Sequence, residues 1–229
     1  MNIAIIPARG GSKEILGKNL KPLNSKPLIA YSIESAKNSK CVDRVIVSTD
    51  DEKIAYTSEK YGAEVIIRPP ELATDVSPSE DALIHVVDTI ERDPNVRVDF
   101  ILFLQATNPI RQYGLIDQCF DKLLKKKGDS LVTVCFDHIF YWKEEEGIGK
   151  SLHNYKVRPM RQLVKTEDFI YRENGSIYIT KRNILMNEKN RLGGKIILFQ
   201  MNYEDSFGID SEFDFWLTER ILEGKRLKK

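Results

Sequence analysis

Short apolar runs alternate with amphipathic segments along residues 1–135, and this alternation limits the folds open to the chain more than any other feature. We predict strands at the apolar runs, which are residues 3–7, 44–48, 63–67, 100–104 and 130–135. The segments between them carry apolar side chains at helical spacing, most clearly at Leu83, Val86, Val87 and Ile90. Apolar strands joined by helices are typical of a parallel sheet covered on both faces. The sequence therefore predicts an α/β fold with a doubly wound, Rossmann-like, mostly parallel sheet.

The alternation is interrupted between residues 139 and 172. This stretch has a turn sequence at residues 144–149, flanked by aromatic side chains, and we interpret it as a hairpin-like excursion that acts as a lid or a dimer arm. Strands are predicted again at residues 176–180 and 195–201, and a last helix opens at Ser211. Because no internal repeat is present, we expect one domain over the whole chain of 229 residues, with this excursion inserted.

Charge and composition exclude several classes of protein. With 35 Lys and Arg against 34 Asp and Glu the net charge is +1, so bulk attraction to nucleic acid or to an anionic membrane is not expected. No apolar run approaches the roughly 18 residues of a membrane helix, and the first residues lack the features of a signal peptide. The three cysteines form no CxxC pair, which is typical of a reducing compartment. We therefore expect a cytoplasmic protein whose partners are neither nucleic acid nor membrane.

The loop after the first predicted strand is rich in glycine and in positive charge. It reads Ala-Arg-Gly-Gly-Ser-Lys over residues 8–13, and Lys18 and Asn19 follow shortly after. Glycines let a backbone approach a phosphate closely, and adjacent N–H groups form a nest for an anion. The loop matches neither the Walker A pattern nor GxGxxG. Because ligands of such sheets bind beyond the carboxyl ends of the strands, we predict an anion site here that uses Arg9, Lys13 and Lys18.

Sequence blocks along nearly the whole chain resemble the CMP-acylneuraminate cytidylyltransferase family, whose members activate sialic acid and other nonulosonic acids. The most specific block is IIPARGGSK at residues 5–13. The others, in family order, are residues 18–19, 26–33, 45–51, 61–65, 68–75, 104–111, 171–179 and 209–215. Because several blocks in one order are far more specific than one motif, the chain is identified as a member of this family. The resemblance implies a nucleotidyltransferase fold.

The resemblance also implies a reaction. The anomeric hydroxyl of a sialic-acid-like nonulosonic acid, of the N-acylneuraminate or legionaminate type, attacks the α-phosphorus of CTP and releases pyrophosphate. Positioning and charge neutralisation dominate catalysis of such a transfer, so the family implies cationic side chains and Mg²⁺ as cofactor. It further implies a homodimer in which the excursion reaches the acceptor pocket of the partner subunit.

The nucleotide side of the site is implied by matching positions. Arg9, Lys13 and Lys18 would act on the triphosphate as catalytic residues. The remaining matches to the nucleotide side are Ser12 and Asn19 in the same loop, and Arg68 and Ser79 around cytosine and ribose. Taken singly, Arg68 could be a solvated loop residue and Ser79 could only help to start a helix.

The acceptor side is implied in the same way. Its matching positions are Gln105, Arg161, Gln162, Arg172 and Asn174. An arginine suits a sugar carboxylate because two parallel N–H donors fit its geometry, although each arginine alone could be an exposed charge.

Asp210 would be a catalytic residue and the ligand of the magnesium ion. Many sialic acid enzymes carry Asp-Ile-Asp here, whereas this chain has Gly208 in the first place. One or two carboxylates suffice for Mg²⁺ when phosphates and waters complete its shell. The alternative is that Asp210 only satisfies backbone N–H groups at the start of the last helix.

Other departures from the family pattern keep two alternative functions open. The family usually reads Lys-Gly-Ile-Pro where this chain has Glu14 after Lys13, and a carboxylate there opposes phosphate binding. Asn108 replaces the usual serine. The alternatives are a cytidylyltransferase for another keto-sugar acid, of the 3-deoxy-octulosonate type, and a non-catalytic nucleotide-binding paralogue.

Overall fold

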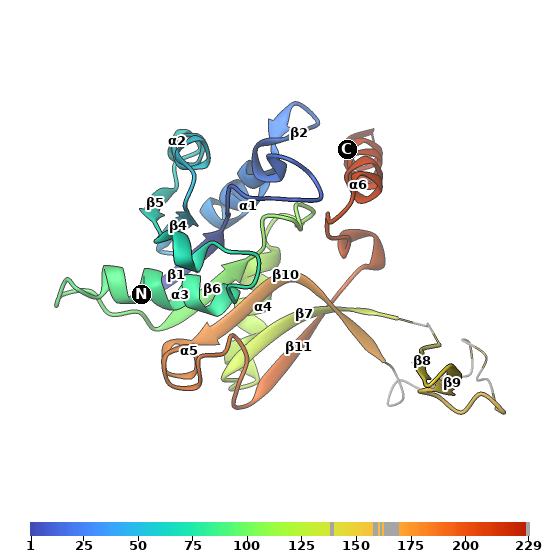
Figure 1. The fold of residues 1–229 in the computed structure, drawn as a ribbon. Helices are drawn as coiled ribbons and strands as arrows, with labels where there is room; N and C mark the ends of the chain where they lie inside the picture. The colour runs from blue at the N-terminus through green and yellow to red at the C-terminus, as the bar shows by residue number, and fades with distance from the viewer. Residues whose placement is uncertain (138–139, 158–159, 161, 163–169, 228–229) are drawn as a thin grey trace.

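One seven-stranded sheet forms the centre of the molecule (Figure 1). The computed structural model describes residues 1–137, 140–157, 160, 162 and 170–227. The strands, in their order across the sheet, are β11 (Ile196–Met201), β7 (Ser130–Phe136), β10 (Tyr171–Lys181), β6 (Phe100–Leu104), β1 (Asn2–Pro7), β4 (Arg44–Thr49) and β5 (Glu64–Ile67). All strands predicted from the apolar runs are present, and the prediction of an α/β fold is confirmed.

The sheet is parallel except at one strand. β1 pairs in parallel with β4 and β6, β4 with β5, and β7 with β11, whereas β10 runs antiparallel between β6 and β7. β10 follows the excursion directly, so the chain re-enters the sheet from the end at which β7 left it. Pairing of β10 with β7 shifts register between Glu173 and Tyr178.

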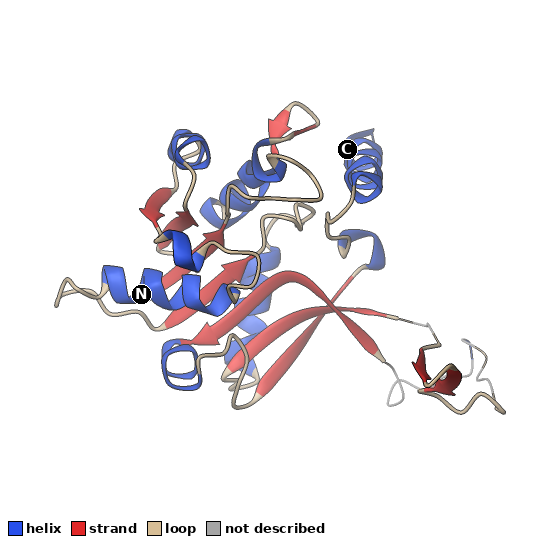
Figure 2. Ribbon diagram, in the orientation of Figure 1, coloured by secondary structure: helices blue, strands red, loops and turns tan. Residues whose placement is uncertain are grey.

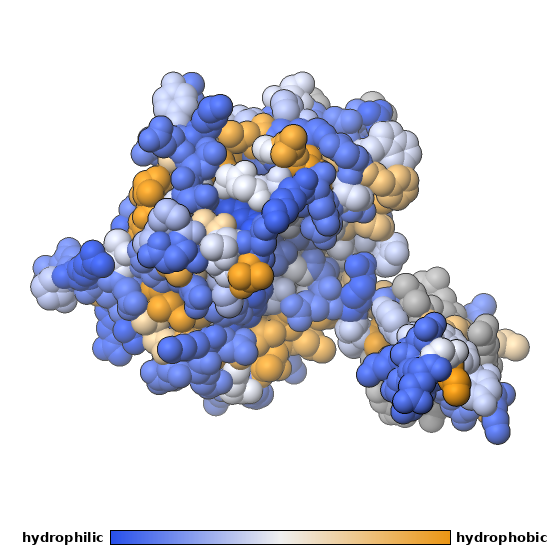
Figure 3. Space-filling model, viewed as in Figure 1, coloured by the Kyte–Doolittle hydropathy of each residue, from blue (hydrophilic) through white to orange (hydrophobic). Residues whose placement is uncertain are grey.

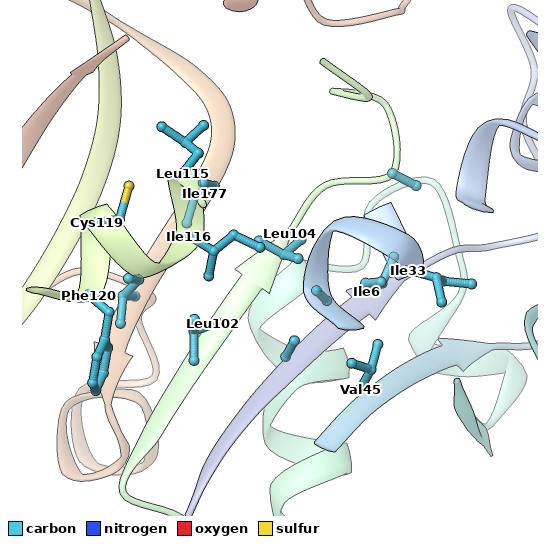
Figure 4. Close-up of a cluster of buried hydrophobic side chains, with 14 of the residues drawn as sticks. Ile6, Ile33, Val45, Leu102, Leu104, Leu115, Ile116, Cys119, Phe120 and Ile177 are labelled. Atoms are coloured by element: carbon cyan, nitrogen blue, oxygen red, sulfur yellow. The ribbon is translucent and has the colours of Figure 1, made fainter. Parts of the chain in front are cut away.

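Helices cover both faces of the sheet (Figure 2). They are α1 (Leu28–Lys37), α2 (Glu52–Lys60), α3 (Ser79–Ile90), α4 (Leu115–Lys125), α5 (Arg182–Glu188) and α6 (Glu212–Leu227). Side chains of α1, α2 and α4 pack with Ala4 and Ile6 of β1, as Figure 4 shows for part of this cluster, whereas α3 and α5 pack with Ile3 and Ile5. Alternate residues of β1 therefore point into two cores, as a doubly wound sheet requires. The sequence analysis did not predict α5.

A third apolar cluster fixes the loop after β1 to the C-terminal helix. It consists of Ile15, Leu23, Leu28, Ile209 and Phe215. The short elements of this region are η1 (Lys18–Leu20), β2 (Pro22–Leu23) and β3 (Lys26–Pro27). Two further single turns are η2 (Pro70–Leu72) and η5 (Tyr203–Asp205). The packing brings the glycine loop next to the start of α6, nearly 200 residues later in the chain.

The excursion contains the hairpin expected from its turn sequence. β8 (Trp142–Glu145) pairs antiparallel with β9 (Ile148–Ser151), and Figure 1 shows them set apart from the sheet, beyond β7 and β10. Glu146 and Gly147 form the turn with positive φ values of 53° and 78°. The predicted acceptor residue Arg161 lies outside the described residues.

The surface is largely polar on the face drawn in Figure 3, with apolar side chains scattered over it. Within the described part of the chain, no helix has the length and apolar character needed to cross a membrane.

Candidate active site

The glycine loop leaves the carboxyl end of β1 and is fixed by two aspartates that follow β4. The Gly10 N–H donates to Asp50 Oδ1 at 3.1 Å. A Cβ on Gly10 would lie 2.9 Å from Asp51 Cβ, so the close approach of these two segments requires glycine. Asp51 is itself fixed, because its Oδ1 accepts the N–H groups of Lys53 and Ile54 at 2.8 and 2.9 Å as the N-cap of α2.

Three cations surround this loop. Arg9 Nη1 lies 2.7 Å from Asp75 Oδ1, and Lys13 pairs with the same carboxylate. Lys18 donates to the Ile209 carbonyl at 2.9 Å and lies 3.5 Å from Asp210 Oδ1. The Lys13 hydrogen bond, aided by the Arg9 charge, lowers the pKa of Asp75. The Lys18 side chain is 12% exposed and that of Lys13 78%, so the Lys18 ammonium is enclosed, whereas the Lys13 ammonium is held at the surface by its ion pair with Asp75.

These cations line a cavity of about 610 Å³ at the carboxyl edge of the sheet, which we call the glycine-loop pocket. Its other polar lining residues are Ser12, Glu14, Asn19, Ser79, Gln105, Thr107 and Asp210. The structure thus brings together most of the residues predicted for the nucleotide side, from segments at residues 9–19, 79 and 105–107. Asn19 also holds the loop, because its Nδ2 donates to the Arg9 carbonyl at 3.0 Å.

Arg68 is placed differently from the rest of that set. Its side chain is 5% exposed, and its Nη2 lies 3.9 Å from Asp50 Oδ1, behind the glycine loop. Burial lowers the pKa of Arg68 despite the nearby Asp50 charge. Arg68 does not line the glycine-loop pocket, and its observed contact is to the carboxylate that holds Gly10.

A second cavity of about 610 Å³ lies beside the first, and we call it the β10 pocket. Gln105, Thr107 and Asp210 line both cavities. The lining residues found only in the β10 pocket include Asn108, Arg172, Glu173, Asn174, Gly175, Tyr178, Tyr203, Phe207, Gly208 and Asp214. Gln105, Arg172 and Asn174 are therefore brought together, whereas Gln162 is exposed and lines neither cavity.

Arg172 lines this pocket and its Nη2 donates to Cys135 Sγ at 3.5 Å. Its Nε lies 3.8 Å from the buried carboxylate of Asp137, and its side chain is 39% exposed. The guanidinium also lies over the Tyr203 ring, 5.9 Å from the centroid.

The Asn174 side chain is used inside the protein. Its Oδ1 accepts from Thr133 Oγ1 at 2.7 Å and from the Ser176 N–H at 3.1 Å, and its Nδ2 donates to Ser206 Oγ at 2.9 Å. The residue is 7% exposed. Its amide therefore shapes the wall of the β10 pocket by joining β7, β10 and the segment before α6.

Asp210 stands at the junction of the two cavities with 81% of its side chain exposed. The start of α6 is capped by other residues: Asp214 Oδ2 accepts the N–H groups of Asp210 and Ser211 at 3.1 and 2.8 Å, and Ser211 Oγ accepts the Asp214 N–H at 3.2 Å. Among the described residues the Asp210 carboxylate accepts no backbone N–H. The alternative reading of Asp210 as a helix-start residue is therefore wrong.

Two of the departures from the family pattern touch each other. A Cβ on Gly208 would lie 3.3 Å from Asn108 Nδ2, tighter than ordinary contact. Asn108 is 2% exposed and donates to the Asn174 carbonyl at 2.7 Å. The side chain at residue 108 thus occupies space that a side chain at residue 208 would need.

A mostly parallel α/β sheet with a cation-lined pocket at its carboxyl edge is typical of nucleotide-binding proteins. The model of the cytidylyltransferase family matches residues 3–229, and the chain belongs to that family. The resemblance stated from the sequence blocks is confirmed, and the protein is an enzyme of the CTP-dependent cytidylyltransferase type.

Individual relatives match over nearly the full chain. The sequence is 34% identical to CMP-N,N'-diacetyllegionaminic acid synthase of Legionella pneumophila, over 96% of both chains. It is 30% identical to post-translational flagellin modification protein B of Campylobacter coli, over 99% of this chain and 97% of that one. It is 32% identical to N-acylneuraminate cytidylyltransferase of Escherichia coli, over 99% of this chain and 53% of that one.

Solved structures share the fold. The structure of CMP:2-keto-3-deoxy-manno-octonic acid synthetase complexed with CTP superposes with a TM-score of 0.72 at 17% identity, over 98% of this chain and 99% of that one. A 4-diphosphocytidyl-2C-methyl-D-erythritol synthase has a TM-score of 0.69 at 14% identity, over 96% and 97% of the two chains.

Two residues around the site, Asp75 and Arg111, were not predicted from the sequence. Asp75 lies in the block at residues 68–75, but nothing in the sequence places it against Arg9 and Lys13. Arg111 ends the block at residues 104–111, and a charged residue directly after an apolar Pro-Ile pair is the only signal that sets it apart.

Proposed function

We propose that this enzyme transfers CMP from CTP to the anomeric hydroxyl of a nonulosonic acid of the N-acylneuraminate or legionaminate type and releases pyrophosphate. The observation that carries the proposal is the junction of two cavities at Gln105, Thr107 and Asp210. One cavity offers cations to a triphosphate, and the other offers an arginine and aromatic walls to a sugar acid. The names of the relatives that match over the full chain support the same substrate class.

In the proposed mechanism the glycine loop binds the triphosphate. The Gly10 N–H is donated to Asp50 and the Ser12 N–H to the Gly10 carbonyl, so the side chains of the loop would meet the phosphates. Arg9, Lys13 and Lys18 neutralise the charge that builds up during transfer. Lys18, fixed by the Ile209 carbonyl, stands next to the junction, where the α-phosphorus would meet the acceptor. When CTP binds, the Lys13 ammonium exchanges its ion pair with Asp75 for one with the phosphates.

The acceptor would lie in the β10 pocket. Arg172 suits its carboxylate because the partly exposed guanidinium lines the cavity, and Gln105 suits a hydroxyl because its amide both donates and accepts. Held in this way, the anomeric hydroxyl approaches the phosphorus from the side opposite to the leaving pyrophosphate.

We propose Mg²⁺ as cofactor, with Asp210 as its protein ligand. The residues fit the ion: an exposed carboxylate that has no capping role stands at the junction, and phosphates and waters complete the shell of a magnesium ion held by one carboxylate. No group of three or more His, Cys, Asp or Glu in the described part of the chain forms an all-protein metal site. The ion would supply charge neutralisation at the phosphates when bound.

We further propose a homodimer in the cytoplasm. The excursion carries exposed apolar side chains, with exposed fractions of 48% for Trp142, 71% for Ile148 and 68% for Val157, which suits a surface covered by a second copy. A monomeric mass by light scattering at micromolar concentration, in an active preparation, would refute the dimer. The three cysteines are free thiols, in keeping with the proposed compartment.

One experiment tests the main proposal. Purified enzyme is incubated with CTP, Mg²⁺ and one acid from a panel of neuraminate, legionaminate, pseudaminate and 3-deoxy-octulosonate types, and pyrophosphate release is measured. We expect turnover with an N-acylated nonulosonic acid. Turnover with 3-deoxy-octulosonate alone would support the second candidate, a cytidylyltransferase of that type. CTP binding without release for any acid would support the non-catalytic paralogue.

A further inference from the structure

Arg111 is a half-buried cation at the edge of a cavity of about 250 Å³, and it has no acidic partner among the described residues. Its Nη1 donates to Ser32 Oγ at 2.8 Å, and its Nη2 donates to the carbonyls of Gln105 and Ser176 at 2.9 and 2.7 Å. No carboxylate pairs with it among the described residues, and its Nε is buried without a hydrogen-bond partner there. Burial lowers the pKa of Arg111 to about 9. A half-buried guanidinium with a buried, unbonded Nε adds little to stability, so the reason for Arg111 must be sought in the groups that it joins.

The two carbonyls mark the point where β6 and β10 separate. The last pair of the antiparallel ladder is Leu104 with Ile177, and Gln105 and Ser176 are the next residues on each strand. At that position the Arg111 Nη2 donates to both carbonyls, and these two hydrogen bonds join the strands in place of the next backbone pair. Beyond it the strands part, and their ends line the β10 pocket.

The separation fixed by Arg111 is critical for Gln105. Gly175 has a φ of +72°, and a Cβ there would lie 2.6 Å from Gln105 Oε1. The Gln105 amide is therefore seated against the bare backbone of Gly175, with Asn108 Oδ1 at 3.4 Å from the same point. A small shift of either strand end moves this amide, which lines both cavities.

We propose that Arg111 is a positioning residue for the transfer: by joining β6 and β10 at the point where their ladder ends, its guanidinium seats Gln105 against Gly175 and so sets the wall of the sugar-acid site. The inference rests on the proposed function for its kinetic consequence. The nucleotide cations come from another segment, residues 9–18, and do not depend on this link.

The kinetic test compares Arg111→Met and Arg111→Lys with Arg182→Met, which removes another arginine, paired with Glu91 at 2.7 Å on the opposite edge of the sheet. For Arg111→Met we expect kcat/KM for the sugar acid to fall about 10- to 100-fold, with KM for CTP little changed. Arg111→Lys restores only part of the lost kcat/KM, because one ammonium cannot donate in the planar geometry of a guanidinium. Arg182→Met lowers stability and leaves both KM values unchanged.

A double-mutant cycle with Gln105→Ala asks whether Arg111 acts through Gln105. We expect Arg111→Met to cost little in that background, because the group it positions is already gone. Wild-type constants in Arg111→Met, an equal loss for both substrates, or full additivity in the cycle would overturn the proposal.

Amide hydrogen exchange gives a readout that needs no substrate. Arg111→Met, or Arg111→Lys if that variant does not fold, raises exchange at residues 105–110 and 174–177 and leaves residues 9–18 unchanged. Unchanged exchange at both strand ends would refute the link. If no sugar acid reacts with the wild type but exchange changes as expected, the proposed function fails and the role of Arg111 in shaping the wall stands.

Discussion

The two cavities are built by different means. The glycine-loop pocket takes its cations from one short segment and leaves them partly exposed, held by ion pairs with Asp75 and Asp210. The β10 pocket draws on segments around residues 105, 174 and 207, which buried hydrogen bonds to Asn108, Asn174 and Arg111 hold together. Arg9 and Lys13, held through an exposed carboxylate, adapt to a flexible triphosphate, whereas a wall joined by the buried amides of Asn108 and Asn174 keeps one shape for a stereochemically defined sugar.

Lys13→Ala gives the largest expected effect and tests the first half of the comparison. If this ammonium neutralises charge on the phosphates, turnover falls about a thousandfold, while the far-UV circular dichroism and the midpoint of thermal unfolding stay unchanged. Lys125→Ala, an exposed lysine at the end of α4, is the control. Near-normal CMP-sugar formation by Lys13→Ala would remove the residue from the mechanism.

The contrast also explains what could be predicted from the sequence. Arg9, Lys13 and Lys18 were found because they lie close together in one loop after a recognisable strand. Most strands and helices followed from their apolar patterns for the same local reason.

The β10 pocket could be predicted only in part. The Asn174 amide forms hydrogen bonds with Thr133 and Ser206. These residues lie far apart in the chain, and no local sequence pattern predicts that they meet. The antiparallel direction of β10 depends on where the excursion returns the chain. The helix α5 has only seven residues and too few turns for a clear apolar period.

Asp210→Asn tests the junction that both cavities share. We expect turnover to fall about a hundredfold and the Mg²⁺ concentration for half-maximal rate to rise, with folding intact because Ser211 and Asp214 cap α6. Glu212→Gln, two residues further on, is the matched control. Wild-type rate and magnesium dependence would exclude Asp210 as the ligand.

A second carboxylate sharpens this test. Gly208→Asp is expected to lower the magnesium requirement only together with Asn108→Ser, because Asn108 fills the space beside Gly208. Equal behaviour of the single and double variants would show that the two positions are independent.

Asn174→Ala tests the second half of the comparison, because here the fold itself should respond. The variant leaves the Ser176 N–H without its acceptor and removes the bonds to Thr133 and Ser206, so we expect the free energy of unfolding to fall by about 1–3 kcal/mol. Denaturant unfolding measures this loss, with Lys13→Ala as the variant that should show none. Unchanged stability would mean that the β10 pocket is no more rigidly built than the glycine-loop pocket.

Asp75→Asn has the smallest expected effect. It tests whether CTP must displace the Asp75 carboxylate from Arg9 and Lys13. In the free protein the Asp75 carboxylate occupies Arg9 and Lys13, so its removal should lower KM for CTP by a few fold, whereas Glu71→Gln in the same loop should not. The Lys13 hydrogen bond lowers the pKa of Asp75 below its ordinary value of 3.8, so the carboxylate stays charged above that value and loses its ion pairs only when the pH falls through the lowered pKa. The ratio of the two KM values should therefore stay constant between about pH 5 and 8. A ratio that shifts across this range would assign the competition to a group other than Asp75, and a raised KM in Asp75→Asn would mean that the carboxylate helps CTP to bind.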